Sequence, residues 1–220
     1  MIISDRYKFV FLHNPKCAGT SVRKTLSDYD DRYSFYWGFD THLNKKIDKA
    51  HMPLYLFKTY RHNDFKLLSE YTCFMFTRHP LKRFISSYNE IKKNRYDAFV
   101  NNEISDDEYV DGVNDFVSNM TQDRVMGKEI YFRHFTKQTL FSSLANKNYL
   151  DVVIKLEDMQ HGISKLNFFN STVASSLKEN ILHKNKKILP KSLSYQEILT
   201  QRSIDQLNDL YMDDFLMFDY

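Results

Sequence analysis

The stretch Tyr7–Ser21, YKFVFLHNPKCAGTS, decides the fold of this chain. Its first part, Tyr7–Leu12, is short, aromatic and β-branched, which is typical of a buried strand. A polar stretch with one glycine, His13–Gly19, follows, and Thr20 or Ser21 is placed to cap the helix that comes next. The chain therefore opens as strand, loop and helix.

The same order recurs further along the chain. Tyr71–Thr77, YTCFMFT, predicts another buried strand, and Pro80 stands where a helix favours proline, at its first position. The apolar residues after it recur at helical spacing and predict the face that packs on the sheet, formed by Leu81, Phe84, Ile85, Tyr88 and Ile91. The residues expected away from that core are Arg83, Ser86, Ser87 and Glu90.

The remaining segments extend the alternation of strands and helices. Further strands are expected at Tyr55–Lys58 and Asp151–Leu156, and helices at Ser105–Met120, Lys137–Leu144, Tyr195–Met212 and after Glu157-Asp158. This order predicts an α/β fold, a single domain over residues 1–220 with a mainly parallel central sheet flanked by helices. Parallel sheets bind ligands beyond the carboxyl ends of their strands. Two polar segments that follow strands, the first loop His13–Ser21 and the second loop Arg78–Tyr88, are therefore expected to converge on one ligand.

Composition excludes several classes of protein. The 220 residues carry a net charge of +3, too little to mark a general nucleic-acid binder. The two cysteines, Cys17 and Cys73, allow at most one disulfide, which fits a reducing compartment. No apolar stretch approaches the roughly 20 residues of a membrane span. The simplest prediction is a cytoplasmic, bacterial protein; a chain of the Golgi lumen trimmed of a membrane anchor would look the same. The oligomeric state is left open.

The first loop has the chemistry of a phosphate site. A strand-to-helix loop offers backbone N–H groups and the positive end of a helix dipole. Gly19 allows close backbone approach, Lys16 adds a mobile charge, and Thr20 and Ser21 add hydroxyls. The pattern is not a P-loop, because Lys16 precedes the glycine instead of following it. An ordinary capped helix after a turn is the alternative, and Cys17 is expected to be a small packing residue.

The second loop places an arginine at the end of a buried strand. A charge there is costly unless it is paired, and the planar guanidinium of Arg78 suits phosphate. Arg83 and Ser86 are expected about one helical turn apart on the solvent side. The alternative is a surface helix with scattered basic residues, with Arg78 paired to a carboxylate.

Together the two loops resemble the donor sites of sulfotransferases that use 3′-phosphoadenosine-5′-phosphosulfate (PAPS). PKCAGTS is similar to their 5′-phosphosulfate loop, and RHPLKRFISSY to their 3′-phosphate site. The closest resemblance is to the carbohydrate O-sulfotransferases, the group of heparan sulfate 2-O-sulfotransferase and the HNK-1 and chondroitin enzymes. Weaker matches follow in the family's order at Ala50–Pro53, His134–Gln138, Lys155–Asp158 and Tyr211–Tyr220. Asn89–Gln122 matches nothing in the family pattern, and Asp219 stands where the family often has glycine.

The resemblance implies a P-loop-kinase-like sulfotransferase fold and an enzyme that moves a sulfuryl group from PAPS to an acceptor hydroxyl by in-line displacement, without a metal. The acceptor is a glycan or another hydroxyl-bearing molecule, and adenosine 3′,5′-bisphosphate is the product. The implied catalytic residues are His51 as general base, Lys16, and His134 as the second choice of base. The implied donor-binding residues are Pro15, Lys16, Cys17, Ala18, Gly19, Thr20, Ser21, Arg78, Arg83, Ser86 and Lys184.

Two other functions stay open from the residues alone. One is a kinase with a degenerate P-loop, and the other is a non-catalytic module that binds a nucleotide or a glycan. Aromatic residues that could stack on a sugar ring, or equally form a core or a lid, are Tyr29, Tyr33, Phe35, Tyr36 and Trp37.

Overall fold

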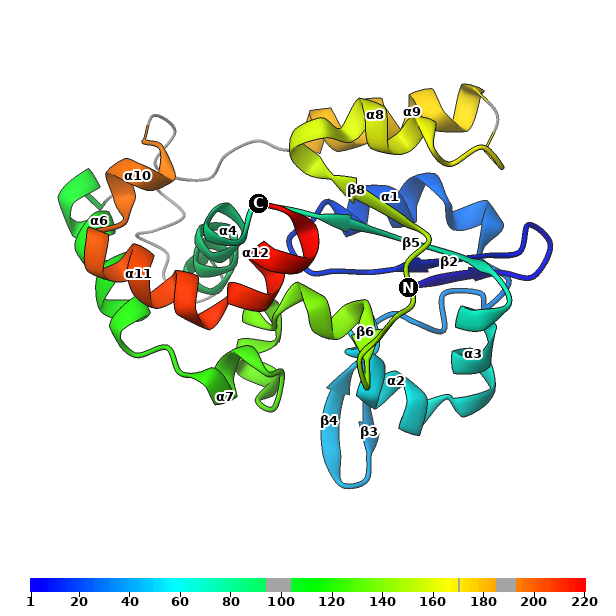
Figure 1. Ribbon diagram of the computed structural model, residues 1–220, viewed down its shortest axis with the longest axis horizontal. Coiled ribbons are helices and arrows are strands. Elements are labelled where there is room, and N and C mark those ends of the chain that lie inside the picture. Colours follow the sequence, from blue (N-terminus) through cyan, green and yellow to red (C-terminus); the bar gives the residue numbers. More distant parts are fainter. Residues whose placement is uncertain (94–103, 170, 185–192) are drawn as a thin grey trace.

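The fold is built on a four-stranded central sheet (Figure 1). The computed structural model describes residues 1–93, 104–169, 171–184 and 193–220. The strands lie in the order β1-β2-β5-β8, with bounds Ile2–Ser4, Phe9–Leu12, Thr72–Thr77 and Val152–Lys155. β2 pairs parallel to β5 and β5 parallel to β8, while β1 adds an antiparallel edge. The predicted α/β fold with a mainly parallel sheet is confirmed.

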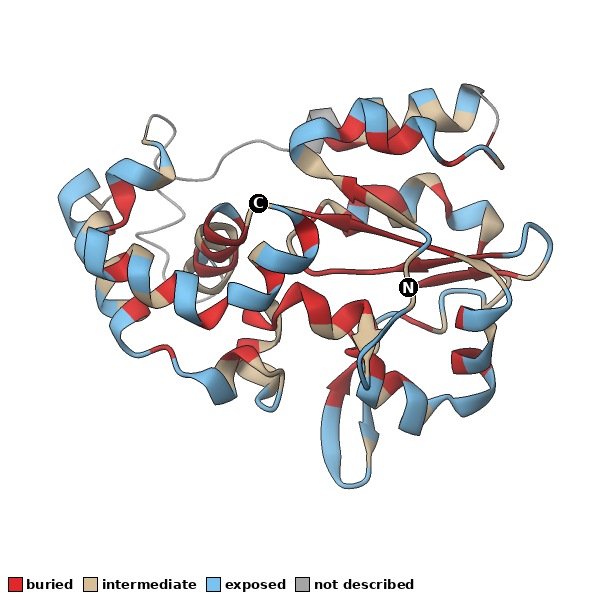
Figure 2. Ribbon diagram, in the orientation of Figure 1, coloured by how far each residue is buried: buried red, intermediate tan, exposed pale blue. Residues whose placement is uncertain are grey.

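Alternation along the strands sends side chains to two separate cores. In β2, Phe9 and Phe11 face one cluster, while Val10 and Leu12 face the other, as the two-residue period of a strand requires. The first cluster is covered by α1 (Gly19–Thr25), α8 (Met159–Ser164) and α9 (Ser171–Lys184). The second is covered by α2 (Leu54–Tyr60), α3 (His62–Lys66) and α12 (Met212–Phe218). Figure 2 shows the sheet buried between these helices, whose outer sides are exposed.

A third core lies beyond the carboxyl ends of the strands. It joins α4 (Pro80–Lys93), α6 (Asp106–Ser118), α10 (Tyr195–Ile198) and α11 (Gln201–Leu210). Figure 1 shows these helices side by side at one end of the sheet. The apolar face of α4 therefore packs in this helical core, and the prediction that it packs on the sheet is wrong; α4 borders the strand ends.

Short elements complete the chain. The 3₁₀ turns are η1 (Ser27–Tyr29), η2 (Leu67–Ser69), η3 (Ile130–Phe135), η4 (Gln138–Phe141) and η5 (Leu156–Asp158), and α7 spans Gln122–Val125. The two hairpins are β3 (Phe39–His42) with β4 (Lys45–Asp48), and β6 (Ser143–Leu144) with β7 (Lys147–Asn148). No helix in the described ranges is both long enough and apolar enough to cross a membrane.

Three predicted elements were wrong. Tyr55–Lys58 lies in helix α2, because Leu54 and Phe57, three residues apart, both pack into a core. Lys137–Leu144 forms the turn η4 and the short strand β6 instead of a helix. Tyr195–Met212 is divided among α10, α11 and the start of α12, since the side chain of Thr200 caps a new helix partway along. The helix expected at Ser105–Met120 is confirmed as α6, with Ser105 as its cap.

Candidate functional site

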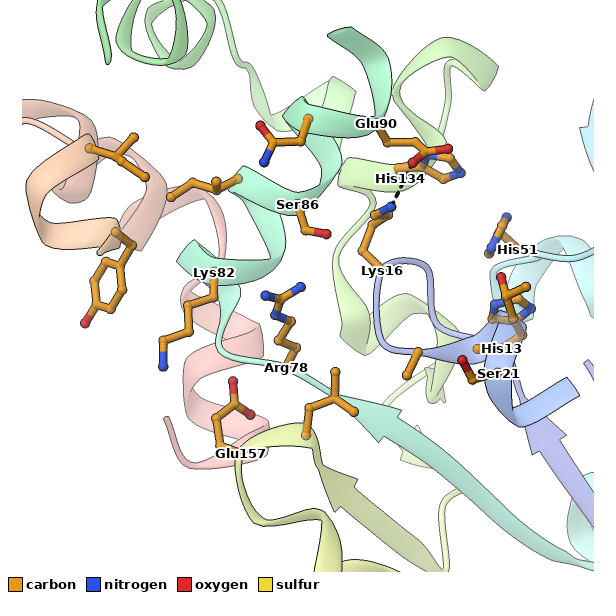
Figure 3. Close-up of a pocket in the computed structure, with 18 of the residues that line it drawn as sticks. His13, Lys16, Ser21, His51, Arg78, Lys82, Ser86, Glu90, His134 and Glu157 are labelled. Atoms are coloured by element: carbon orange, nitrogen blue, oxygen red, sulfur yellow. Dashed lines mark hydrogen bonds and ion pairs between the residues drawn. The ribbon is translucent and has the colours of Figure 1, made fainter. Parts of the chain in front are cut away.

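A cleft of about 1010 Å³ opens at the carboxyl ends of β2 and β5 (Figure 3). Both polar loops reach it, as expected for strand ends that lie side by side. The predicted site residues that line it are Lys16, Ala18, Gly19, Thr20, Ser21, His51, Arg78, Ser86 and His134. Pro15, Cys17 and Arg83 do not line it. The side chain of Lys184 lies outside the described residues.

The first loop turns into its helix through two left-handed residues. Lys16 has φ 63° and Ala18 has φ 61°, and Ala18 is the residue that precedes α1. No side chain caps this helix, so the prediction that Thr20 or Ser21 does so is wrong. Gly19 is required by packing, since a Cβ there would lie 1.9 Å from the His13 ring.

Pro15 and Cys17 do not line the cleft. Both are buried. Burial raises the pKa of Cys17 to about 12, so the thiol stays protonated and packs as a small apolar group. The expected packing role of Cys17 is confirmed.

Lys16 reaches across the cleft to α4. Its Nζ lies 3.2 Å from Glu90 Oε2, and both side chains keep partial exposure, 21% and 35%. Figure 3 shows this pair spanning the space between the first loop and α4. The first loop and α4 are therefore connected by a charge pair that an anionic ligand can compete with.

Arg78 supplies a second cation to the cleft. Its guanidinium makes no hydrogen bond or ion pair with any residue in the described part of the chain, and Figure 3 shows it directed into the cleft. Burial lowers the pKa of Arg78, the effect of a cation held out of water without a counter-charge at contact distance. An anion in the cleft would relieve that cost.

Arg83 does not lie on the solvent side of its helix, and that prediction is wrong. The side chain is 1% exposed and donates from Nη1 to His134 O at 3.1 Å and from Nη2 to Thr136 O at 2.5 Å. Ser87, also buried, donates to the same His134 carbonyl at 2.8 Å. Because α4 packs on two sides, this face holds η3 in place instead of facing a ligand.

The cleft face of α4 includes Ile85, Asn89 and three residues that follow one another at a spacing of four. Lys82, Ser86 and Glu90 all line the cleft, as helical spacing places them on one side. Lys82 and Glu90 were not assigned to the site from sequence. Their four-residue spacing from Ser86 was the available signal.

Three imidazoles, those of His13, His51 and His134, line another part of the cleft. The ring centroids of His13 and His51 are 4.4 Å apart, and those of His51 and His134 are 5.1 Å apart. Trp37 lies parallel to His13 at 6.4 Å and is 47% exposed. The two candidate bases, His51 and His134, therefore meet here, with an aromatic ring at the rim.

The surroundings of these histidines keep them neutral. Burial lowers the pKa of His13 well below its ordinary value and that of His134 to about 2. Burial also lowers the pKa of His51, but a hydrogen bond to Asp48 opposes the effect. Burial alone would raise the pKa of Asp48. Contact with His51 and the charge of Arg133 nevertheless bring the pKa of Asp48 to about 2. Asp48 is thus a carboxylate beside a neutral imidazole.

Asp48 was missed from sequence. It lies three residues before His51 at the end of β4, and the turn that follows brings the two side chains together. Asp48, His51 and His134 offer ligand atoms within 4.8 Å of one another, a spacing that could suit a cation. Asp48 Oδ2, however, already accepts from His51 and Arg133. The contacts fit a hydrogen-bonded dyad better than a metal centre.

The weaker sequence matches form the frame of the site. The side-chain oxygen of Gln138 accepts from Asn14 of the first loop at 2.8 Å, and Asp214 accepts from the backbone N–H of Gln138 at 2.9 Å. Tyr220 contacts Thr77 at 3.1 Å and Glu157 at 3.2 Å, which fixes the end of β5. Besides His51 and His134, Leu156 and Glu157 of these segments also line the cleft, while Gln138, Asp214 and Tyr220 position the strand ends and loops.

Comparison with known proteins gives one match. A family model described as "Sulfotransferase family" matches residues 1–220, the whole chain. Neither the curated proteins nor the solved structures contain a match to the chain.

Proposed function

Because the chain belongs to the sulfotransferase family, we propose that it transfers the sulfuryl group of PAPS to a hydroxyl of a carbohydrate acceptor. The observation that carries the proposal is the meeting of two cationic loops at one cleft, with Lys16 and Arg78 both in its lining. Its volume of about 1010 Å³ is at the upper end of small-molecule sites. A nucleotide donor and part of an acceptor fit that space together.

The donor is held at its two anionic ends. The second loop takes the 3′-phosphate, through the guanidinium of Arg78 and the hydroxyl of Ser86, which face the same cleft. The first loop takes the 5′-phosphosulfate. The first N–H groups of a helix have no hydrogen-bond partner within the helix. Gly19 and Thr20 are the first residues of α1 and line the cleft, so their N–H groups are available to bind the phosphosulfate. Ser21 N–H is already used, since it donates to Ala18 O at 2.9 Å.

Lys16 has the role that most affects the rate. The acceptor oxygen forms a bond to sulfur while the bond from sulfur to the 5′-phosphate oxygen breaks. Negative charge then accumulates on the leaving bisphosphate, and a cation already in place stabilises it most in this transition state. The Lys16 ammonium can leave Glu90 and donate to the leaving 5′-phosphate instead, because the pair of Lys16 and Glu90 is partly exposed and weak.

His51 takes the proton of the acceptor hydroxyl. A neutral imidazole is the form that a general base needs, and lowering of the pKa of His51 keeps it in that form at neutral pH. His134 is the weaker base, because burial brings its pKa to about 2. Trp37 lies at the rim beside His13 and is 47% exposed, with the Arg23 guanidinium 4.9 Å from its ring centroid. The exposed part of the ring can contact a sugar, which supports a carbohydrate acceptor.

Two substitutions test the donor site. We expect Lys16→Ala to lower kcat by about 10²–10³-fold in transfer of labelled sulfate. We expect Arg78→Ala to weaken binding of adenosine 3′,5′-bisphosphate by at least about tenfold in calorimetry, as the loss of a charged hydrogen bond implies. Unchanged kinetics and binding in both variants would refute the site assignment.

Controls separate this function from the alternatives. Lys24→Ala and Arg202→Ala remove exposed cations outside the cleft and should leave both readouts unchanged. A kinase would bind ATP–Mg²⁺ more tightly than the bisphosphate. A binding module would bind the bisphosphate but transfer sulfate to no acceptor in a hydroxyl array.

A further inference from the structure

We infer that Asp48 is a positioning residue for the transfer reaction: it holds His51 with the proton on Nδ1, so that Nε2 is left to receive the acceptor proton. This inference rests on the proposed function and adds to it a carboxylate and the tautomer of the base. Asp48 touches neither donor nor acceptor and acts through His51.

Both oxygens of Asp48 are engaged. Oδ2 accepts from His51 Nδ1 at 2.8 Å and from Arg133 Nε at 2.8 Å. Oδ1 accepts from the backbone N–H of Ala50 at 3.0 Å. The carboxylate is 7% exposed, so water does not compete strongly for it. A group held at both oxygens cannot rotate, and the ring bonded to it is fixed in turn.

The backbone reinforces the same arrangement. His51 N–H donates to Asp48 O at 3.2 Å, closing the turn that follows β4. Arg133 also donates from Nη1 to Ile130 O at 3.1 Å, which anchors the guanidinium to η3. The ring of His51 is therefore held from its own turn and from a segment far away in sequence.

Neither neighbouring imidazole has such a partner among the described residues. His13 Nδ1 is buried without a hydrogen bond. The His134 backbone carbonyl accepts from Arg83 and Ser87, and the His134 ring packs edge-on against His51 without a hydrogen bond to a described carboxylate. An imidazolium formed during the reaction needs a nearby negative charge. Of these three histidines, His51 has that charge beside it, on the Asp48 carboxylate.

The chemical consequence concerns one proton. As the acceptor oxygen bonds to sulfur, its proton moves to His51 Nε2, and the electron pair of the broken S–O bond leaves with the bisphosphate. His51 becomes a cation beside the Asp48 carboxylate, which stays ionised. Loss of the charge on Asp48 should therefore slow the chemical step and leave donor binding intact.

Kinetics of three variants test this. We expect Asp48→Asn to lower kcat by on the order of 10²–10⁴-fold, the effect of removing an orienting carboxylate, with the bisphosphate Kd changed less than about twofold. The double variant Asp48→Asn with His51→Ala should be no slower than His51→Ala alone, because Asp48 acts only through that ring. Asp209→Asn, an exposed acid outside the cleft, is the matched control.

Two outcomes overturn the inference on kinetic grounds. One is a kcat of Asp48→Asn within about threefold of wild type. The other is a double variant much slower than His51→Ala, which would mean that Asp48 supports the fold or another group. If Asp48→Asn does not fold, Asp48→Glu keeps the charge and should retain more activity than Asp48→Ala.

A spectroscopic readout needs no turnover. The ¹⁵N shifts of His51 in wild-type protein should show a protonated Nδ1 and a bare Nε2 at neutral pH; the opposite tautomer refutes the inference. In Asp48→Asn the imidazole should titrate at lower pH, since the carboxylate raises its pKa. The other groups that face His51 are His13, His134, Arg133 and the Met1 amine, which the substitution leaves in place.

If the wild-type protein transfers sulfate to no hydroxyl, the proposed function fails, while the tautomer of His51 still reports the Asp48–His51 contact.

Discussion

Gln138 closes a pair of hydrogen bonds with the backbone of Arg78. Its Nε2 donates to Arg78 O at 2.9 Å, and its Oε1 accepts from Arg78 N at 3.1 Å. The same Oε1 accepts from Asn14 Nδ2 at 2.8 Å. One fully buried amide therefore joins the first loop to the second, and Asp214 holds its backbone. The relative position of the two loops depends on this side chain.

Gln138→Ala should loosen both loops at once. Without the amide, Asn14 and the Arg78 peptide lose buried partners, at a cost of about 1–3 kcal/mol in the free energy of unfolding. Urea denaturation measures this loss, and calorimetry should show weaker bisphosphate binding as well. Gln160→Ala, on the exposed side of α8, is the control. Unchanged stability together with unchanged binding would contradict a joining role for Gln138.

The two arginines of the second loop should separate stability from binding. Arg83→Ala removes the donor to the Thr136 carbonyl, while the His134 carbonyl keeps its hydrogen bond from Ser87; one buried acceptor left unsatisfied costs about 1–3 kcal/mol in the free energy of unfolding. Arg78→Ala should leave the free energy of unfolding almost unchanged but weaken the bisphosphate. Denaturation and calorimetry on both variants check this, and the reverse pattern would contradict the assignment of Arg83 to the framework.

Glu90 should compete with the donor for Lys16. Breaking their 3.2 Å pair is part of donor binding, so Glu90→Gln should tighten bisphosphate binding about two- to fivefold at low salt, the range of an exposed pair. The gain should shrink as salt screens the charges. Calorimetry at two ionic strengths measures it, with the exposed Glu179→Gln as control. Weaker binding would instead mean that Glu90 orients Lys16 for the donor.

The substitution Gly19→Ala tests the contact between the first loop and His13. A new Cβ would lie 1.9 Å from the imidazole, so the ring or the loop must shift, at a cost of about 1–3 kcal/mol. In a His13→Ala background the space is open and the same substitution should cost much less. Thermal unfolding of the four proteins of this cycle gives the comparison; equal costs in both backgrounds would exclude the contact as the cause.

The activity should depend on pH through His51. A base works unprotonated, and burial lowers the pKa of His51 from its ordinary 6.5. The rate of sulfate transfer at saturating donor should therefore be level from pH 8 down to about 6.5 and fall only below that value. A pH–rate profile measures this. A fall that begins above pH 7 would show that a different group supplies the base.

The sequence by itself determined the three parallel strands, β2, β5 and β8, and the two polar loops that follow β2 and β5. Runs such as FVFL and TCFMFT alternate between two cores, and this pattern is local. Because parallel strands end at one edge of a sheet, the convergence of Lys16 and Arg78 also followed from local information. The position of His51 near both loops was not local, and it came only from resemblance to a family.

The tertiary structure alone decided which polar side chains face the cleft. Arg83 was assigned to solvent because one apolar face was visible in its helix, whereas α4 packs on two sides and Arg83 bonds to a carbonyl 51 positions away. Asn14 and Gln138 meet across 124 positions, and Arg133 reaches Asp48 across 85. A buried polar group must find a partner, but the sequence does not say which one. Chain packing makes that choice: the Arg83 guanidinium donates to two carbonyls, whereas that of Arg78 has no hydrogen-bond partner in the described part of the chain and points into the cleft.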